Sequence, residues 1–220
     1  MTFMRTSIAA LLAATATLLA SIAHADDAPL PKDATPFGQR SRVIVSAENV
    51  FGGLAESIST SADTEDNSTS LNSNGLFPGF TGPRFGVHFV VGSSITVGLG
   101  LSAWSFKNTT VLSQSTSLTT IRVAPRVGWA PAIDGHFAVW LRAGPTLVYL
   151  HSTESDLTNP NPTYTFFDVS LEAYGVWTPY SHFGVMVGPS IDIPVSGKNG
   201  DETDLRFQSI GFLGGLFVDF

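Results

Sequence analysis

The five histidines are the side chains best suited to acid–base chemistry in this chain, and their neighbours decide whether they could activate a nucleophile. A histidine two residues from a serine on one strand face, oriented by a carboxylate, would form such a pair. None of the five has a serine at that spacing, and the nearest case, His151-Ser-Thr153, carries threonine instead. The chain has no cysteine, which excludes thiol chemistry, disulfides and cysteine-type zinc sites. We therefore predict that the protein is not an enzyme and has no catalytic residue.

Charged side chains recur at alternate positions within otherwise apolar segments. Successive side chains of a β-strand point to opposite faces, so residues at alternate positions share a face. Arginine is always charged and binds carboxylates in a forked geometry. We predict that one shared face forms an interior polar network, made of Arg42, Glu48, Arg84, His88, Arg122, Arg126, Arg142, Asp168, Glu172 and Asp192.

Two stretches gather carboxylates outside these segments, at residues 63–66 and 201–204. Carboxylate oxygens are ligands that calcium prefers, and cations held there could bridge to lipid phosphates, but neither stretch has the spacing of an EF-hand loop. Acidic runs of this kind are most often solubilising. We predict no metal site and no cofactor.

Eight segments with alternating apolar residues are the elements that must position the charges. They are Arg42–Leu54, Pro83–Val91, Ile95–Phe106, Leu118–Ala130, His136–Leu150, Tyr164–Trp177, Phe183–Val195 and Leu205–Phe220. A tilted strand needs about 9–11 residues to cross a membrane. The connections alternate between short turns and longer polar loops, a pattern typical of outer-membrane barrels, whose long loops face the outside. The pattern predicts an all-β fold, an eight-stranded antiparallel up-and-down transmembrane β-barrel.

The composition agrees with this fold. Only 13% of residues are charged and mean hydropathy is +0.21, yet no segment after the N-terminal one is apolar in a continuous block. Aromatic residues gather near the short turns on the apolar face, as at a membrane–water interface. We predict a periplasmic aromatic girdle of Trp129, Phe137, Trp177, Phe183 and Phe220.

Prolines at three strand positions oppose a regular ladder, because proline has no backbone N–H to donate. Ala143-Gly-Pro-Thr-Leu147 and Val187-Gly-Pro-Ser-Ile191 form a weak internal repeat, and Pro125 lies in a looser copy. We expect Gly-Pro bulges to accommodate these residues.

The N-terminus has the features of a secretory signal peptide. Arg5 precedes an apolar run, and Ala23-His24-Ala25 forms a cleavage site before Asp26. We predict a signal peptide over residues 1–25, a short periplasmic lead over 26–37 and the barrel over 38–220. Cleavage would remove one arginine and change the net charge from −7 to −8, which argues against nucleic acid as a partner.

Together these features resemble the small outer-membrane β-barrel proteins of the OmpA, OmpX and OmpW type, over the whole chain from Gly38 to Phe220. The resemblance implies a Gram-negative outer-membrane location, with membrane lipids, lipopolysaccharide and the barrel-insertion machinery as partners. It also implies that an aromatic C-terminal strand is read as an insertion signal, here Phe212, Leu216, Val218 and Phe220. The partner of the loops stays open.

Three functions remain compatible with the sequence. The first is a non-enzymatic barrel with an ion-paired interior and exposed loops, serving envelope structure or interaction. An eight-stranded barrel is only just wide enough for side chains, and buried ions must be paired, so we favour a filled interior. The second is a narrow passive channel for small or hydrophobic solutes. The third is a soluble secreted barrel or sandwich, whose apolar faces would point inward.

Overall fold

The computed structural model describes residue 37 and residues 43–60, 68–76, 82–109, 115–154, 162–180, 182–199, 202–203 and 205–220. The predicted signal peptide, the lead before Phe37 and Arg42 lie outside these residues.

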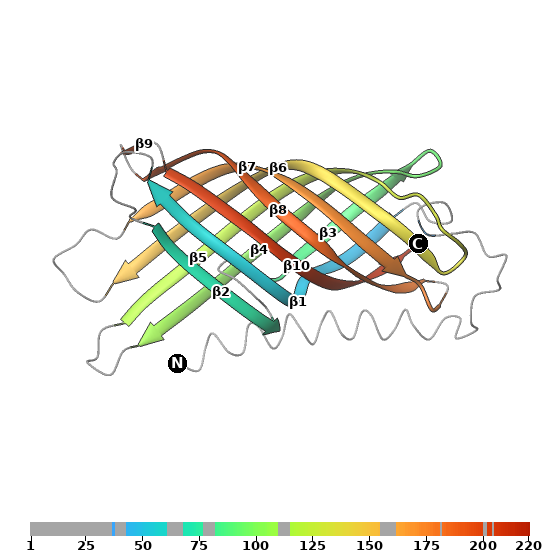
Figure 1. Ribbon diagram of the computed structural model, residues 1–220, viewed down its shortest axis with the longest axis horizontal. Coiled ribbons are helices and arrows are strands. Elements are labelled where there is room, and N and C mark those ends of the chain that lie inside the picture. The colour runs from blue at the N-terminus through green and yellow to red at the C-terminus, as the bar shows by residue number, and fades with distance from the viewer. Residues whose placement is uncertain are drawn as a thin grey trace.

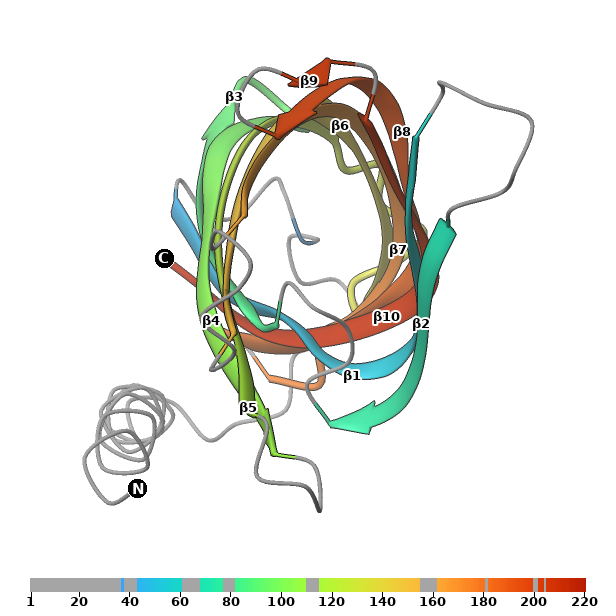
Figure 2. The same cartoon turned by 90° about the vertical axis from the view of Figure 1, so that its left-hand side faces the viewer.

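Ten β-strands make up the described part of the chain (Figure 1). They are β1 Val43–Thr60, β2 Ser68–Leu76, β3 Arg84–Val91, β4 Ile95–Thr109, β5 Ser115–Trp129, β6 Phe137–Glu154, β7 Thr163–Trp177, β8 Phe183–Asn199, β9 Glu202–Thr203 and β10 Leu205–Asp219. Each strand pairs antiparallel with its neighbour in the order β10-β1-β3-β4-β5-β6-β7-β8, and β8 pairs with β10 to close the ring (Figure 2). The predicted eight-stranded antiparallel up-and-down barrel is confirmed. None of the described residues forms a helix long and apolar enough to cross a membrane.

The start of β1 and the C-terminus meet at the end of the barrel that carries the short turns (Figure 1). Val43 and Phe220 exchange two backbone hydrogen bonds, at 3.1 and 2.8 Å. Asp134 closes the turn between β5 and β6, because its Oδ1 accepts the backbone N–H groups of His136 and Phe137, both at 2.7 Å. These two hydrogen bonds lower the pKa of Asp134 below its ordinary value.

At the other end the strands run further than the apolar pattern predicts. β1 continues to Thr60, β6 to Glu154 and β8 to Asn199, and β2 forms inside a stretch expected to be a loop. Backbone pairing needs no apolar side chain, so a ladder of serine, threonine and asparagine can extend a barrel into water. Hydrophobic alternation therefore predicts the part of each strand within the apolar belt and not its polar extension.

A bulge in β1 sets the direction of its side chains. Ala47 pairs with Leu216 and Phe51 with Gly214, so β1 gains two residues on β10. Asn49 adopts φ 55° and Gly52 φ 134°, and a Cβ on Gly52 would lie 2.2 Å from the Phe212 carbonyl oxygen. Two extra residues preserve the alternation, so β1 buries Glu48 within the bulge and Glu56 beyond it on the same face.

The expected Gly-Pro bulges are wrong. The β5–β6 register is the same before and after Pro125, since Val123 pairs with Leu147 and Val127 with Ala143. The β5–β6 ladder lacks backbone hydrogen bonds opposite the proline, but its register does not change. Proline removes a donor without adding a residue, so it leaves a gap in the hydrogen bonds only.

The glycines before two of these prolines allow neighbouring strands to approach closely. A Cβ on Gly188 would lie 1.9 Å from the Ala173 carbonyl oxygen, and one on Gly144 would lie 2.2 Å from the Pro125 carbonyl oxygen. Backbone atoms cannot move aside as a flexible side chain can. The repeated Gly-Pro pair therefore marks two places where the wall is drawn together.

Gly188→Ala is expected to destabilise the barrel by about 1–3 kcal/mol, the usual cost of overpacking. Gly175→Ala is the matched control, because a Cβ there meets only the Val187 carbonyl oxygen at 3.6 Å, an ordinary contact in the same strand pair. Urea unfolding of both variants in lipid vesicles, followed by tryptophan fluorescence, measures the difference. Equal midpoints would show that the close approach is not required.

Candidate functional site

The structure buries every described member of the predicted interior polar network. Nine of the ten residues are described, and each is at most 4% exposed. They come from six strands, β1, β3 and β5 to β8, and their side chains point to the barrel axis because they occupy alternate positions. The tenth, Arg42, lies outside the described residues.

Glu48 on β1 is the first centre of this network. Its carboxylate accepts hydrogen bonds from Arg84 Nε at 2.6 Å, from Arg142 Nη1 at 2.5 Å and from Arg142 Nη2 at 3.0 Å. The Ser46 hydroxyl donates to it at 2.7 Å, and His88 Nε2 lies 3.3 Å away. Two guanidinium groups thus share one carboxylate, out of contact with water.

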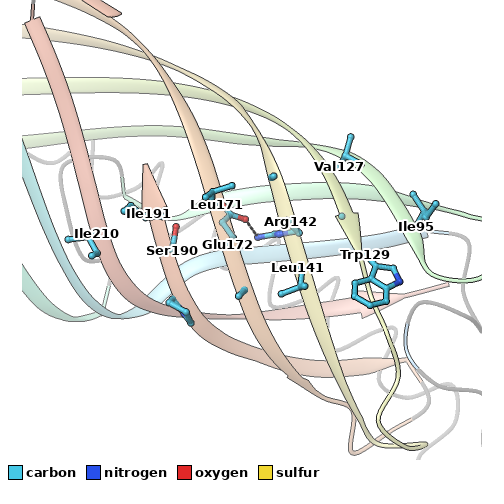
Figure 3. Close-up of a pocket in the computed structure, with 14 residues that line it drawn as sticks. Ile95, Val127, Trp129, Leu141, Arg142, Leu171, Glu172, Ser190, Ile191 and Ile210 are labelled. Atoms are coloured by element: carbon cyan, nitrogen blue, oxygen red, sulfur yellow. Dashed lines mark ion pairs between the residues drawn. The ribbon is translucent and has the colours of Figure 1, made fainter. Parts of the chain in front are cut away.

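Glu172 on β7 is the second centre and binds three arginines. Its Oε1 lies 2.6 Å from Arg84 Nη2 and 3.2 Å from Arg126 Nη2, and its Oε2 lies 2.6 Å from Arg142 Nη2. Figure 3 marks the ion pair between Arg142 and Glu172, which also face each other as backbone partners on β6 and β7. Arg84 and Arg142 bridge both carboxylates, so the two centres form one cluster.

Aromatic rings take up part of the excess positive charge. The cluster holds three arginines and two carboxylates, and the Arg142 guanidinium lies 4.4 Å from the Trp140 ring centroid and 4.8 Å from that of Tyr174. Such contacts contribute roughly 2 kcal/mol or more when desolvated. The Trp140 indole N–H donates to the Thr96 hydroxyl at 2.9 Å, which satisfies its only donor.

Arg126 connects the cluster to the barrel wall. Its Nη1 donates to the carbonyl oxygens of Pro125 and Pro145, at 2.9 and 2.8 Å. These carbonyls stand where proline interrupts the β5–β6 ladder, so the guanidinium satisfies acceptors that the wall leaves free. The same side chain donates from Nη2 to the Thr146 hydroxyl at 2.9 Å.

A hydrogen-bonded chain continues toward the loop end. Thr146 Oγ1 lies 2.6 Å from Ser170 Oγ, Ser170 donates to Asp192, and Arg122 Nη2 reaches Asp192 Oδ2 at 2.6 Å. Asp168 is fully buried beside this chain, and neither of its carboxylate oxygens has a hydrogen-bond partner among the described residues.

Sequence reasoning missed several members of the interior. Glu56, assigned to a loop, is buried on β1, and Asp219 is buried on β10. Trp140, Tyr174, Thr96 and Ser170 complete the contacts between charges. Glu56, Trp140, Tyr174 and Ser170 stand at even spacing from network residues on their own strands, so the same face rule would have found them. Thr96 and Asp219 lie on β4 and β10, where the predicted network has no member.

Two apolar layers enclose the charged cluster. On the side of the short turns, Phe37 packs against Trp140 and Phe217, with ring centroids 5.3 and 4.9 Å apart. Seven further residues pack around these three: Ile44, Ala130, Ala138, Tyr174, Val176, Met186 and, partly buried, Val90. On the side of the loops, Phe166, Phe207, Val148 and Leu205 form a second cluster.

Large apolar side chains are exposed on the outer surface of β3 to β8 and of β10. Leu99, Leu141 and Val187 are between 38% and 41% exposed. Of the predicted girdle, Trp129, Phe137, Trp177 and Phe220 are exposed near the short turns and Phe183 is half-buried.

In the predicted C-terminal signal, Phe212 and Phe220 are exposed and Leu216 is half-buried, whereas Val218 is only 2% exposed. Val218 pairs with Val45 and Phe183, so the alternate residues of the C-terminal strand are not all exposed.

No described histidine forms the pair that nucleophilic catalysis requires. Ser46 donates to Glu48 and not to His88, so the carboxylate binds the hydroxyl that a histidine would need to reach. His151 Nδ1 lies 2.9 Å from Thr163 Oγ1 and not near Thr153.

These features define a closed antiparallel barrel with a charged interior and an apolar outer surface. The chain is similar in structure to Neisserial surface protein A, with 13% identity and a TM-score of 0.49 over 81% of this chain and 97% of that one. It is also similar to Ail, the attachment invasion locus protein of Yersinia pestis, in complex with the heparin analogue sucrose octasulfate, with 11% identity and a TM-score of 0.44 over 80% of this chain and 99% of that one. No family model and no curated protein sequence matches the chain. The resemblance to small bacterial outer-membrane barrels holds for the fold, which rests on the strand pairing described above.

Proposed function

We propose that the chain is an integral barrel of the Gram-negative outer membrane, exported with a cleaved signal peptide. The observation that carries the proposal is the sorting of side chains across one wall. Arg142 is 3% exposed, while Leu141 beside it in the same strand is 39% exposed. A charge on the lipid face would cost about 2–4 kcal/mol at mid-membrane, so hydrocarbon outside explains why the charges stay inside.

The interior supports a closed scaffold. A solute passing along the axis would have to displace the Phe37–Trp140–Phe217 layer, break the arginine–carboxylate cluster and pass the layer around Phe166. Removing one partner from a buried ion pair costs about 3–5 kcal/mol. The proposed role is therefore structural and interactive, with the polar strand extensions and loops facing the surroundings, and it requires no catalytic group.

The insertion machinery and outer-membrane lipids, including lipopolysaccharide, are the proposed partners. The aromatic end of β10 supports the first, since Phe212 and Phe220 are exposed on its outer face. The apolar belt supports the second. The ligand of the loops is a separate question, which the fold does not decide.

Gel mobility tests membrane-barrel folding directly. Refolded in detergent, the unboiled protein should migrate differently from the boiled protein in SDS, because a closed ladder resists the detergent. A protein that stays in solution without detergent and shows one mobility would contradict the proposal. The soluble alternative also required inward apolar faces, whereas Leu99, Leu141 and Val187 face outward.

Conductance in planar bilayers separates the closed scaffold from the passive channel. We expect no reproducible single-channel steps from the refolded protein. Steps that disappear on replacing Arg126 or Glu172 would establish a pore through the charged cluster.

A further inference from the structure

The exposed positive charges whose side chains the structure describes lie at one place. Among residues whose side chains the structure describes, Lys198 on β8 and Arg206 on β10 are the exposed basic residues. The four other described basic side chains, Arg84, Arg122, Arg126 and Arg142, are buried in the interior. The chain as a whole carries a net charge of −7, so two cations side by side on its surface stand out from their surroundings.

Both cations line one hollow of about 310 Å³ at the loop end of the wall. The hollow lies beyond the last β8–β10 pair toward the loops, Asp192 with Ser209, where β8 continues alongside β7. Thr165 and Ser196 also line it and supply hydroxyl groups. Neither Lys198 nor Arg206 makes an ion pair with another residue in the described part of the chain. The hollow therefore offers two cations and two hydroxyls, the donors that a phosphate group binds.

An apolar track begins in the same hollow and continues down the same strands. Phe167 and Val195 line its lower side and are exposed. Ile193 follows, and below it a groove of about 850 Å³ begins over Leu171, Ile191 and Ile210 on β7, β8 and β10. The groove continues across β6 and β5 to Trp129 and to Ile95 on β4 (Figure 3). Lys198 and Ile191 are seven positions apart, roughly 23 Å along the strand.

Charge above and hydrocarbon surface below match the two ends of a phosphorylated lipid. A soluble anion could use only the upper hollow, and an uncharged lipid only the groove. We propose that β7, β8 and β10 form a binding site for a phosphate-bearing lipid of the outer leaflet, with its phosphate at Lys198 and Arg206 and an acyl chain in the groove. This site rests on the membrane location proposed above.

Three probes that separate headgroup from chain test the site in uncharged detergent micelles. They are phosphatidic acid, diacylglycerol with the same chains, and inorganic phosphate, each titrated against the refolded full chain by native mass spectrometry and thermal unfolding. Phosphatidic acid should bind most tightly and raise the unfolding temperature. Each basic residue near a lipid surface contributes about 1 kcal/mol, so K198Q/R206Q should weaken phosphatidic acid binding roughly tenfold to thirtyfold and leave diacylglycerol unchanged.

Lys107→Gln is the charge-matched control, since Lys107 lies on β4, across the ring from β8 (Figure 2). It should leave the affinity for phosphatidic acid unchanged. Glu202→Gln should strengthen binding, because Glu202 pairs with Asn199 next to Lys198 and its removal takes away a negative charge. Gel mobility of each variant, unboiled and boiled, shows that the barrel has folded before binding is compared.

Equal affinity for phosphatidic acid and diacylglycerol would overturn the proposed site, as would an equal loss in K107Q. Inorganic phosphate that displaces phosphatidic acid at similar concentration would also overturn it, because the apolar track would then contribute nothing. These outcomes leave the heat-modifiable mobility of the barrel intact. Loss of that mobility in the unmodified protein would contradict the membrane barrel itself.

Discussion

Glu172→Gln is expected to lower the stability of the folded barrel by about 3–5 kcal/mol, which is the cost of breaking a buried ion pair by removing one partner. The carboxylate binds Arg84, Arg126 and Arg142 at once. An amide of the same shape leaves Arg84 and Arg142 with Glu48 as their carboxylate partner and takes from Arg126 the carboxylate that it binds. Equilibrium urea unfolding in lipid vesicles, followed by tryptophan fluorescence, measures the loss.

A second substitution shows whether charge is the cause. E172Q/R126Q removes one cation together with the carboxylate, so its loss should be smaller than the sum of the two single losses. Asp134→Asn, in an exposed turn, is the carboxylate-to-amide control. The amide oxygen can still accept the backbone N–H groups of His136 and Phe137, so the urea midpoint should shift far less than in E172Q. Strictly additive losses would mean that the arginines find other partners and that the cluster does not act as a unit.

Leu171→Arg is the second large effect, with an expected loss of about 2–4 kcal/mol for a cation at the middle of the lipid face. Leu171 is 44% exposed and pairs with Ala143 and Ile191, well inside the apolar belt. In water an arginine at a half-exposed strand position would be close to neutral. The loss of stability in L171R therefore shows whether lipid or water surrounds the barrel at Leu171.

Ile133→Arg is the matched control outside the belt. Ile133 is 69% exposed in the turn between β5 and β6, where the side chain reaches water or headgroups. The expected cost there is about 0–1 kcal/mol. The same vesicle unfolding experiment compares the two, and an equal effect at both positions would contradict a depth-dependent lipid environment.

The sequence predicted the features that depend on strict alternation of inward and outward side chains along each strand. Arg122 and Arg126, or Glu172 and Asp168, share a face because their spacing is even, and the structure places all four inside. Strand count and the short turns followed from the same pattern together with glycine and proline punctuation. The alternation is strict because a charged side chain at an outward position would contact the hydrocarbon of the membrane.

Other features depend on contacts between distant residues and leave no local pattern. Arg126 donates a hydrogen bond to the carbonyl oxygen of Pro145, nineteen positions along the chain, and no sequence pattern near either residue predicts this bond. Proline was expected to force bulges, but Gly144 and Gly188 let the strands close around the missing hydrogen bonds instead. Glu56 was missed because polar strand extensions look like loops once hydrophobic alternation ends.

Depth-dependent fluorescence quenching tests most directly which face meets the lipid. Three single-tryptophan proteins, each keeping one of Trp129, Trp140 and Trp177 and losing the other three of the chain's four tryptophans, would be refolded into vesicles of lipids brominated at known depths. Trp129 and Trp177, exposed on the outer wall, should be quenched by bromine near the headgroup, and Trp140, fully buried beside Arg142, should not. Quenching of Trp140 in place of Trp129 and Trp177, or of none of the three, would contradict the account.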